Sequence, residues 1–140
     1  ILPDETAYEV FGKLTVAAEQ TLWNVLPAML DGRTPKLPND VSKGSYFGGR
    51  KPEDGRIDWS QPAQAVYNLH RAVAPPYPGA WTTIGEKKFI VDKARLSGME
   101  QANLPSGLAV VDNCIFGVCG DGRTLLIHEL LADGKPVSPV

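Results

Sequence analysis

The stretch from Asp58 to Trp81, which reads DWSQPAQAVYNLHRAVAPPYPGAW, decides the fold because it marks a change from helix to strand. Ser60 can cap a helix, and Pro62 is tolerated in a first helical turn. Apolar side chains then recur at the spacing of one helical face, at Val66, Leu69 and Val73. The Pro75-Pro76 pair ends this helix, since proline has no backbone N–H to donate. The stretch therefore predicts a short helix that leads into a β-rich region.

Short strands are expected from Gly79 onward. The runs rich in β-branched and apolar residues are 80–84, 88–96, 107–112, 115–119 and 124–131. Gly85-Glu86, Asp112-Asn113 and the glycines at 120 and 122 supply tight-turn chemistry between them. Five short strands at this spacing predict a small OB-like antiparallel β-barrel domain that includes the one helix before it.

The first part of the chain reads as a long amphipathic helix. Thr6 and Glu9 have the spacing of a capping box, and Asp31-Gly32 supplies a C-terminal glycine. Pro27 is expected to kink or end the helix. Apolar residues recur along one stripe: Phe11, Leu14, Ala18, Leu22, Val25 and Met29. Such a stripe needs a surface to pack on, so the rest of a larger domain is expected to cover it.

Residues 32–58 contain scattered Pro and Gly with almost no apolar periodicity, which is typical of a linker or a working loop. Near Tyr46 we expect this loop to face a substrate. The predicted organisation is a helix at 1–31, a linker and substrate-facing loop at 32–59, and a β-rich domain at 60–140.

Composition excludes several classes of protein. The 140 residues are 43% hydrophobic and 21% charged, which is ordinary for a globular domain. The formal net charge of −2 disfavours non-specific binding to nucleic acid or to an anionic membrane. Two cysteines are too few for a disulfide framework, and they fit a reducing compartment. No signal peptide is visible, and the first residue, Ile1, indicates a fragment or a processed product.

Residues that could carry chemistry have structural explanations as well. Asn68 and His70 are two positions apart on a helix, so they cannot act together on one atom, and a surface or interdomain role is favoured for His70. His128 in an apolar strand is expected to be structural. Cys114 and Cys119 would lie on opposite faces of a strand, and no further ligands are near, which disfavours a metal site.

The cluster Tyr46-Phe47-Gly48-Gly49-Arg50-Lys51 is more informative. Its two cations can meet a phosphate, and its two aromatic rings can stack on a base. Its two glycines let the backbone approach a ligand closely. The cluster matches neither the P-loop nor the dinucleotide-binding fingerprint, and an exposed polar turn is the alternative interpretation.

Two longer segments carry a resemblance to a known family. Residues 47–59, which read FGGRKPEDGRIDW, closely resemble the segment that joins the two domains of 10-formyltetrahydrofolate-dependent formyltransferases. Residues 68–81, which read NLHRAVAPPYPGAW, resemble another stretch of that family. The resemblance covers essentially the whole chain. It implies that residues 1–31 are the last helix of a Rossmann-like catalytic domain, an α/β tail in front of an OB-like C-terminal domain.

Within the family, the form YFGGRKPEDG is closest to the branch that formylates UDP-4-amino-4-deoxy-L-arabinose, a nucleotide sugar used in lipid A modification. Methionyl-tRNA formyltransferases are the next closest branch. Residues 61–140 hold seven Lys or Arg and seven Asp or Glu, whereas a tRNA-binding domain should be basic. The resemblance therefore implies a cytoplasmic transferase that uses 10-formyltetrahydrofolate as formyl donor and a UDP-amino sugar as acceptor.

The same resemblance places the catalytic Asn, His and Asp and the folate site in a part of the family that precedes Ile1. No catalytic residue is therefore expected in this chain, and Asn68-Leu69-His70 is a coincidental match to the family's Asn-x-His motif. Of the candidate substrate-binding residues, Tyr46 and Phe47 would contact the base, and Arg50 and Lys51 the diphosphate. Trp59 and Tyr77 would wall the cleft. An alternative of another class is a non-catalytic OB module that stacks nucleic-acid bases on Tyr77 and Trp81.

Overall fold

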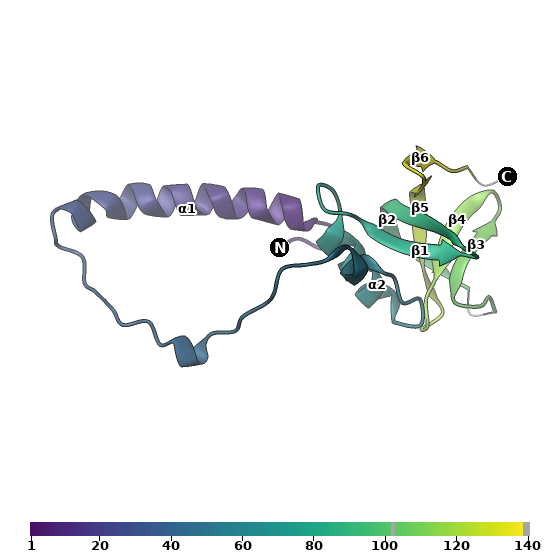
Figure 1. Ribbon diagram of the computed structural model, residues 1–140, viewed down its shortest axis with the longest axis horizontal. Helices are drawn as coiled ribbons and strands as arrows, with labels where there is room; N and C mark the ends of the chain where they lie inside the picture. Colours follow the sequence, from purple (N-terminus) through teal and green to yellow (C-terminus); the bar gives the residue numbers. More distant parts are fainter. Residues whose placement is uncertain (102, 139–140) are drawn as a thin grey trace.

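The computed structural model describes residues 1–101 and 103–138, in which a long helix projects from a curled sheet (Figure 1). Helix α1 spans Ala7–Leu30 and helix α2 spans Ala63–Val73. A long loop carries the chain from the far end of α1 back to the sheet (Figure 1). Two short 3-10 turns interrupt this loop, η1 at Val41–Lys43 and η2 at Pro52–Gly55.

Helix α1 begins where the sequence predicts. The Thr6 side chain accepts a hydrogen bond from the Glu9 backbone N–H, and the Glu9 carboxylate accepts one from the Thr6 N–H at 2.7 Å. At the other end Asp31 caps the helix, and Gly32 has a φ of 68°, a conformation that favours glycine. Pro27 does not end the helix, as one alternative held, because it lies inside it and three more helical residues follow.

Helix α2 starts later than its predicted cap. The Ser60 hydroxyl donates to the Asp58 carboxylate at 2.6 Å, so it stabilises the turn before the helix instead of the helix itself. The N-cap position is Pro62, which has no side-chain donor or acceptor. The Ala63 N–H donates to the carboxylate of Asp121, which lies in the turn between two strands. A long-range contact therefore replaces the local cap that was predicted.

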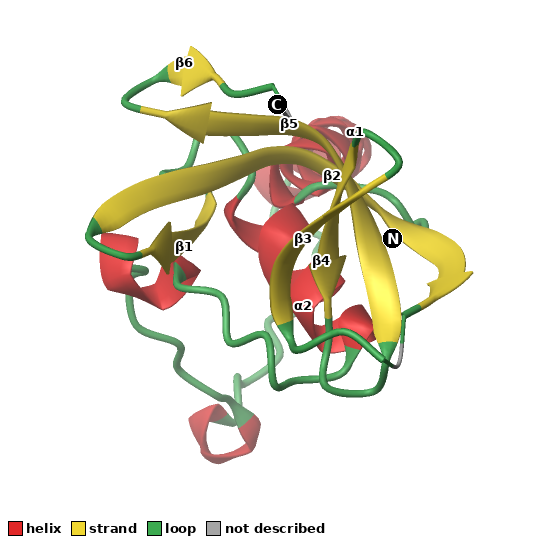
Figure 2. Cartoon of the chain, turned by 90° about the vertical axis from the view of Figure 1, so that its right-hand side faces the viewer, coloured by secondary structure: helices red, strands yellow, loops and turns green. Residues whose placement is uncertain are grey.

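The sheet is antiparallel and carries all the predicted strands. Its strands are β1 (Ala80–Ile84), β2 (Lys87–Glu100), β3 (Gly107–Val111), β4 (Cys114–Val118), β5 (Arg123–Ala132) and β6 (Lys135–Pro136). The order is β1-β2-β5-β4-β3, and β6 pairs with β5. Register shifts in the β2–β5 pair bend the long strand β2. The sheet curls into a half-barrel around α2, so the antiparallel β prediction holds in this partly closed form (Figure 2).

The core lies between α2 and the inner face of the sheet. Val66 and Val73 of α2 are buried there, together with Val91, Leu125 and Ile127 of the sheet. None of the residues of α1 is buried, and the exposed fraction of Leu14 is 62%. The helix that the sequence analysis expected to be covered therefore presents its apolar stripe outward.

Trp59 fixes the segment before α2 onto the sheet. A Cβ placed on Gly117 of β4 would lie 2.2 Å from the Trp59 ring, so the indole occupies the space above this glycine. The Trp59 indole N–H donates to the Thr82 hydroxyl at 3.0 Å. The absence of a side chain at Gly117 is thus a condition for burying Trp59.

We expect Gly117→Ala to destabilise the chain by about 1–3 kcal/mol, the usual cost of overpacking a filled core. Gly98→Ala is the matched control, because Gly98 also lies in a strand and a Cβ added to it would have no neighbouring atom within 4 Å. Urea denaturation followed by tryptophan fluorescence measures both changes. Equal unfolding midpoints for the two variants would contradict the packing described for Trp59.

Candidate functional site

Tyr46 and Phe47 lie in the returning loop between η1 and η2. Their exposed fractions are 94% and 87%, so both aromatic rings are available to a ligand or to another protein surface. Neither Tyr46 nor Phe47 lines the cavities that contain Arg50, Lys51 and Tyr77. Their contact with a nucleotide base stays a prediction.

Arg50 and Lys51 lie where the loop reaches α2. The Arg50 guanidinium donates to the carbonyl of Ala72, near the C-terminal end of α2, and a cation is favourable at that end of a helix. The Lys51 backbone N–H donates to the Asp54 carboxylate at 2.8 Å. Within the described residues the Lys51 ammonium forms no ion pair. Lys51 therefore keeps its charge available, whereas Arg50 has a structural contact as well.

A small cavity of about 50 Å³ brings three of the predicted site residues together. Arg50, Lys51 and Tyr77 line it, with Pro52, Gly55, Val73, Pro78 and Gly79. The loop is held tightly at this point, since a Cβ on Gly55 would lie 2.5 Å from the Gly79 carbonyl oxygen. The two predicted cations and one predicted aromatic residue thus line one small cavity beside α2.

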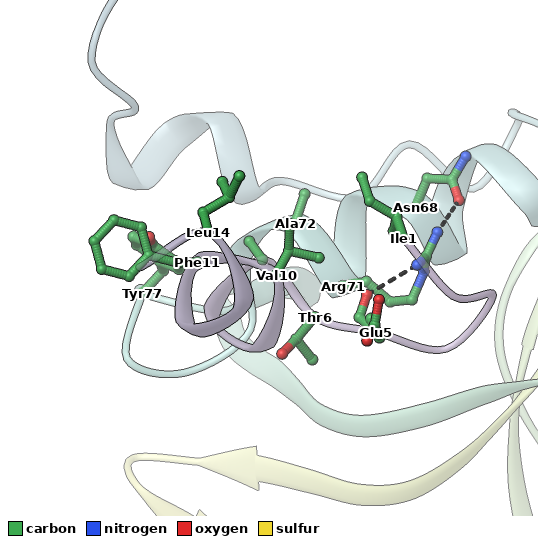
Figure 3. Close-up of a pocket in the computed structure, with 11 residues that line it drawn as sticks. Ile1, Glu5, Thr6, Val10, Phe11, Leu14, Asn68, Arg71, Ala72 and Tyr77 are labelled. Carbon is green, nitrogen blue, oxygen red and sulfur yellow. Dashed lines mark hydrogen bonds between the residues drawn. The ribbon is translucent and has the colours of Figure 1, made fainter. Parts of the chain in front are cut away.

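A larger open groove of about 340 Å³ lies between the start of α1 and α2, and it shares Tyr77 with the small cavity. Phe11 and Tyr77 lie at one end of this groove and Asn68 and Arg71 at the other (Figure 3). Its lining is mostly apolar. Sequence reasoning placed Phe11 only on the apolar stripe of α1, and no sequence signal placed Arg71 in a site.

Arg71, Asn68 and Glu5 of the groove bond within the chain, although the Arg71 Nε is buried without a partner among the described residues. Arg71 donates to the Glu5 carbonyl at 2.9 Å and to the Asn68 side-chain oxygen at 2.7 Å (Figure 3). The Glu5 side chain accepts from Lys13, and this bond together with the Leu2 N–H lowers the pKa of Glu5. A pterin ring needs several free donors and acceptors that converge on it. The groove therefore does not fit the folate that the resemblance implies.

Trp59 lies in the core, with an exposed fraction of 9%, and its ring packs on β4. This position differs from the cleft wall predicted for it, because the ring is covered by the sheet. Tyr77 has an exposed fraction of 42% and lines both hollows. Of the two residues predicted as walls, Tyr77 is the one that a ligand can reach.

Asn68 and His70 point to different surroundings, as the helical spacing predicts. Asn68 is exposed and accepts from Gln64 and Arg71, while the exposed fraction of His70 is only 5%. The prediction of a surface or interdomain His70 is therefore wrong, since this side chain packs between α2 and the sheet. Burial lowers the pKa of His70, and the Val91 carbonyl opposes this effect only in part.

His128 and the two cysteines are the remaining side chains whose roles were predicted from the sequence. In the described part of the chain no three His, Cys, Asp or Glu residues are placed to hold a metal ion. Cys114 is exposed and Cys119 is buried, and burial raises the pKa of the Cys119 thiol to about 11. His128 is exposed on β5 and lines a hollow that also contains His70 and Asp92, and its structural role stays a prediction. None of the helices among the described residues is both long and apolar enough to cross a bilayer.

The buried His70 makes a prediction about pH. Its pKa in the folded chain lies below the ordinary value of 6.5, so the unfolded chain takes up a proton first as the pH falls. Stability should therefore decrease as the pH falls below about 6.5, until the folded-state pKa is reached. Urea midpoints at about pH 7.5 and about pH 5 measure the decrease.

His70→Leu should make the urea midpoint less dependent on pH over this range, because the group that titrates differently in the two states is gone. His128→Leu is the matched control, since His128 is exposed on β5. A pH dependence that survives unchanged in His70→Leu would show that other groups cause it.

Comparison with known proteins gives the family. Residues 50–140 match the model of the formyl transferase C-terminal domain. A crystal structure of a HypX variant from Aquifex aeolicus is 16% identical with a TM-score of 0.66, over 91% of this chain and 23% of that one. HypX crystallised with tetrahydrofolic acid is 18% identical with a TM-score of 0.59, over 86% of this chain and 21% of that one.

A further similar structure is WlaRD, described as a sugar 3N-formyl transferase crystallised in the presence of dTDP and 5-N-formyl-THF. It is 15% identical with a TM-score of 0.65, over 96% of this chain and 47% of that one. At these identities the structural similarity shows the fold, and this chain spans less than half the length of each of these proteins. The family match covers more than half of the chain. The chain therefore belongs to the formyl transferase C-terminal domain family.

Proposed function

We propose that this chain is the C-terminal part of an enzyme that transfers a formyl group from 10-formyltetrahydrofolate to the amine of a sugar nucleotide, with UDP-4-amino-4-deoxy-L-arabinose as the acceptor. The observation that carries the proposal is that Arg50, Lys51 and Tyr77 line one cavity beside α2. Two cations beside an exposed aromatic ring suit a diphosphate attached to a flat base.

The similar proteins support the class of reaction. WlaRD is described as a sugar formyltransferase and was crystallised with a nucleoside diphosphate, and HypX was crystallised with tetrahydrofolic acid. When bound, the folate supplies the formyl group. We assign its site, and the catalytic Asn, His and Asp, to a part of the enzyme outside this chain. The bond between Arg71 and Asn68, the polar side chains at one end of the groove, supports this assignment.

In this arrangement the chain binds and orients the acceptor. The Arg50 guanidinium has several N–H donors, so it can hold the Ala72 carbonyl and a phosphate oxygen together. The Lys51 ammonium adds a second positive charge, and Tyr46 and Phe47 are exposed enough to cover a base. The methionyl-tRNA alternative is less favoured, because residues 61–140 carry no net charge.

The nucleic-acid alternative relied on Tyr77 and Trp81 as stacking platforms, and of these Trp81 already has contacts within the chain. The Trp81 indole N–H donates to the Pro52 carbonyl at 2.9 Å, and Lys88 lies 4.4 Å from the ring centroid. Arg56 lies 5.9 Å from the same centroid. The chain's own cations thus already occupy positions at this ring, which leaves less of it for a base.

In the intact enzyme, Arg50→Ala should raise the KM for the sugar nucleotide by about ten- to a hundredfold, because a charge-assisted contact is lost. The KM for the formyl donor should hardly change. Lys51→Ala should act in the same direction more weakly, since an ammonium lacks the bidentate fork. The Lys51 side chain makes no bond to α2. A change in KM caused by Lys51→Ala therefore reflects ligand binding and not the loss of a contact that holds the loop.

Lys36→Ala is the control, because Lys36 is an exposed loop cation outside both cavities. Steady-state kinetics with each substrate varied in turn measure the three variants. Sugar-nucleotide kinetics unaltered in both Arg50→Ala and Lys51→Ala would defeat the site, while the family membership would stand.

We also propose that the remainder of the catalytic domain covers α1. Phe11, Leu22 and Met29 are all more than half exposed, and on the opposite flank Trp23 is 82% exposed. Apolar faces of this extent on a soluble protein mark an interaction surface. A helix that is apolar on two flanks fits the interior of a larger α/β domain better than a flat surface.

The chain alone should therefore bind a hydrophobic dye and self-associate through α1. The double variant Leu22→Glu/Met29→Glu should lose both properties, because it places charges on the stripe. Gln20→Glu/Asn24→Glu is the control, with the same charges on two polar positions of the helix. Dye fluorescence and analytical ultracentrifugation measure the outcome, and a dye-free monomer before mutation would contradict the proposal.

A further inference from the structure

A hollow of about 380 Å³ lies where α2 faces β2 and β5, and residues 4, 6 and 9 around the start of α1 contribute another wall. We call it the polar hollow and define it by five of its lining residues: His70, Arg71, Asp92, Arg95 and His128. Its volume falls within the range of roughly 300–1,000 Å³ that small-molecule sites occupy. The proposed function assigns no role to these five residues.

The pairing of β2 with β5 is irregular at the polar hollow. On β2 the paired residues pass from Val91 to Lys93, so the ladder skips Asp92. On β5 it skips His128 in the same way, directly before Glu129, the partner of Lys93. Such bulges redirect side chains and are frequent beside functional sites. The two skipped residues lie on neighbouring strands, and both line the polar hollow.

Two residues of the polar hollow have buried polar atoms without a partner among the described residues, His70 at Nδ1 and Arg71 at Nε. The Val91 carbonyl is a hydrogen-bond partner of His70, and burial lowers the pKa of its ring. At neutral pH the single N–H therefore lies on Nε2, and Nδ1 is an acceptor. The Arg71 Nε–H is a donor. Unpaired buried groups are unfavourable, so the contents of the hollow should supply both a donor and an acceptor.

The charged groups of the polar hollow show the same mixture of donors and acceptors. Among the described residues the Asp92 carboxylate forms no ion pair. The Arg95 guanidinium lies 4.0 Å from the Asp4 carboxylate, and 69% of its side chain is exposed. Asp4, Glu9 and Asp92 all line the hollow and disfavour an anion. A metal ion is disfavoured as well, because the described residues hold no group of three suitable ligands.

We propose that the polar hollow binds a neutral saccharide, whose hydroxyl groups donate to Asp92 and His70 and accept from Arg71 and Arg95. A hydroxyl group both donates and accepts, so it suits a hollow that offers carboxylate, imidazole and guanidinium together. An anion would satisfy the guanidinium groups alone. The inference does not depend on the formyl donor or on the acceptor that the enzyme uses.

The test is saturation-transfer difference NMR with methyl β-L-arabinopyranoside, a neutral sugar, as the probe. The method detects weak ligands, and it tolerates the self-association through α1 that was proposed above. A titration of the signal gives the Kd. The control compound is 2-methoxytetrahydropyran, which has the same ring and methoxy group but no free hydroxyl group.

The parent chain should give a saturable signal with the sugar and none with the control compound. Asp92→Ala and Arg95→Ala should each raise the Kd by about tenfold or more, because a hydrogen bond to a charged group is lost. Glu100→Ala and Arg123→Ala are the matched controls, since they remove an exposed acid and an exposed arginine elsewhere on β2 and β5. Both should leave the Kd unchanged.

Asp92→Asn keeps the size of the side chain and should weaken binding in the same direction, so the test does not rely on the alanine variant alone. Urea midpoints check that each variant is folded. The proposal is overturned if the parent gives no saturable signal, which would leave the hollow to ordered water. It is also overturned if the control compound binds equally well, if the variants at Asp92 and Arg95 keep the parent Kd, or if inorganic phosphate displaces the sugar at constant ionic strength.

Discussion

The contact between the Trp59 indole and Gly117 is the constraint on which the rest of the structure depends. It lays the segment before α2 directly on β4, and the hydrogen bond to Thr82 joins the same ring to β1. A second close approach lies at the next residue of this segment, where a Cβ on Gly120 would be 1.8 Å from the Ser60 carbonyl oxygen. These two missing side chains bring α2 to its place across the sheet.

The two sides of α2 make different contacts. One side is apolar and closes the half-barrel, with His70 as its only ionisable buried group apart from the Tyr67 phenol. The other side carries Arg71, which donates to the Glu5 carbonyl just before α1, and the Ala72 carbonyl, which accepts from Arg50 at the end of the returning loop. The same helix thus completes the core and connects it to everything that precedes residue 51.

Local signals in the sequence predicted much of this fold. The capping box at Thr6, the glycine at position 32 and the strands between tight turns all depend on neighbouring residues, and each is present. The predictions that failed concern positions whose structure depends on a residue that is distant in the sequence. Ser60 bonds to Asp58 while Asp121 caps α2, and His70 is buried because β2 lies across the helix.

The candidate site was predictable only in part, for the same reason. The residue types of Arg50, Lys51 and Tyr77 indicated a ligand with an anion and a base, and these three residues do meet. Trp59 is aromatic as well, but its ring is buried in the core, because Gly117, more than fifty residues later, leaves space for it. The bond from Arg50 to Ala72 joins residues 22 positions apart, and no spacing rule relates them.

The contacts of Arg71 with Glu5 and of Ala72 with Arg50 lie at adjacent residues of α2, and this adjacency has a consequence for the length of the returning loop. Since α1 leaves from Arg71 and the returning loop ends at Ala72, α1 and the loop together bridge the same gap whatever their length. Closing a longer or shorter excursion over a fixed gap changes the entropy only slowly. A loop lengthened between positions 31 and 45 should therefore cost little stability, whereas a shortened loop must still reach back along the whole of α1.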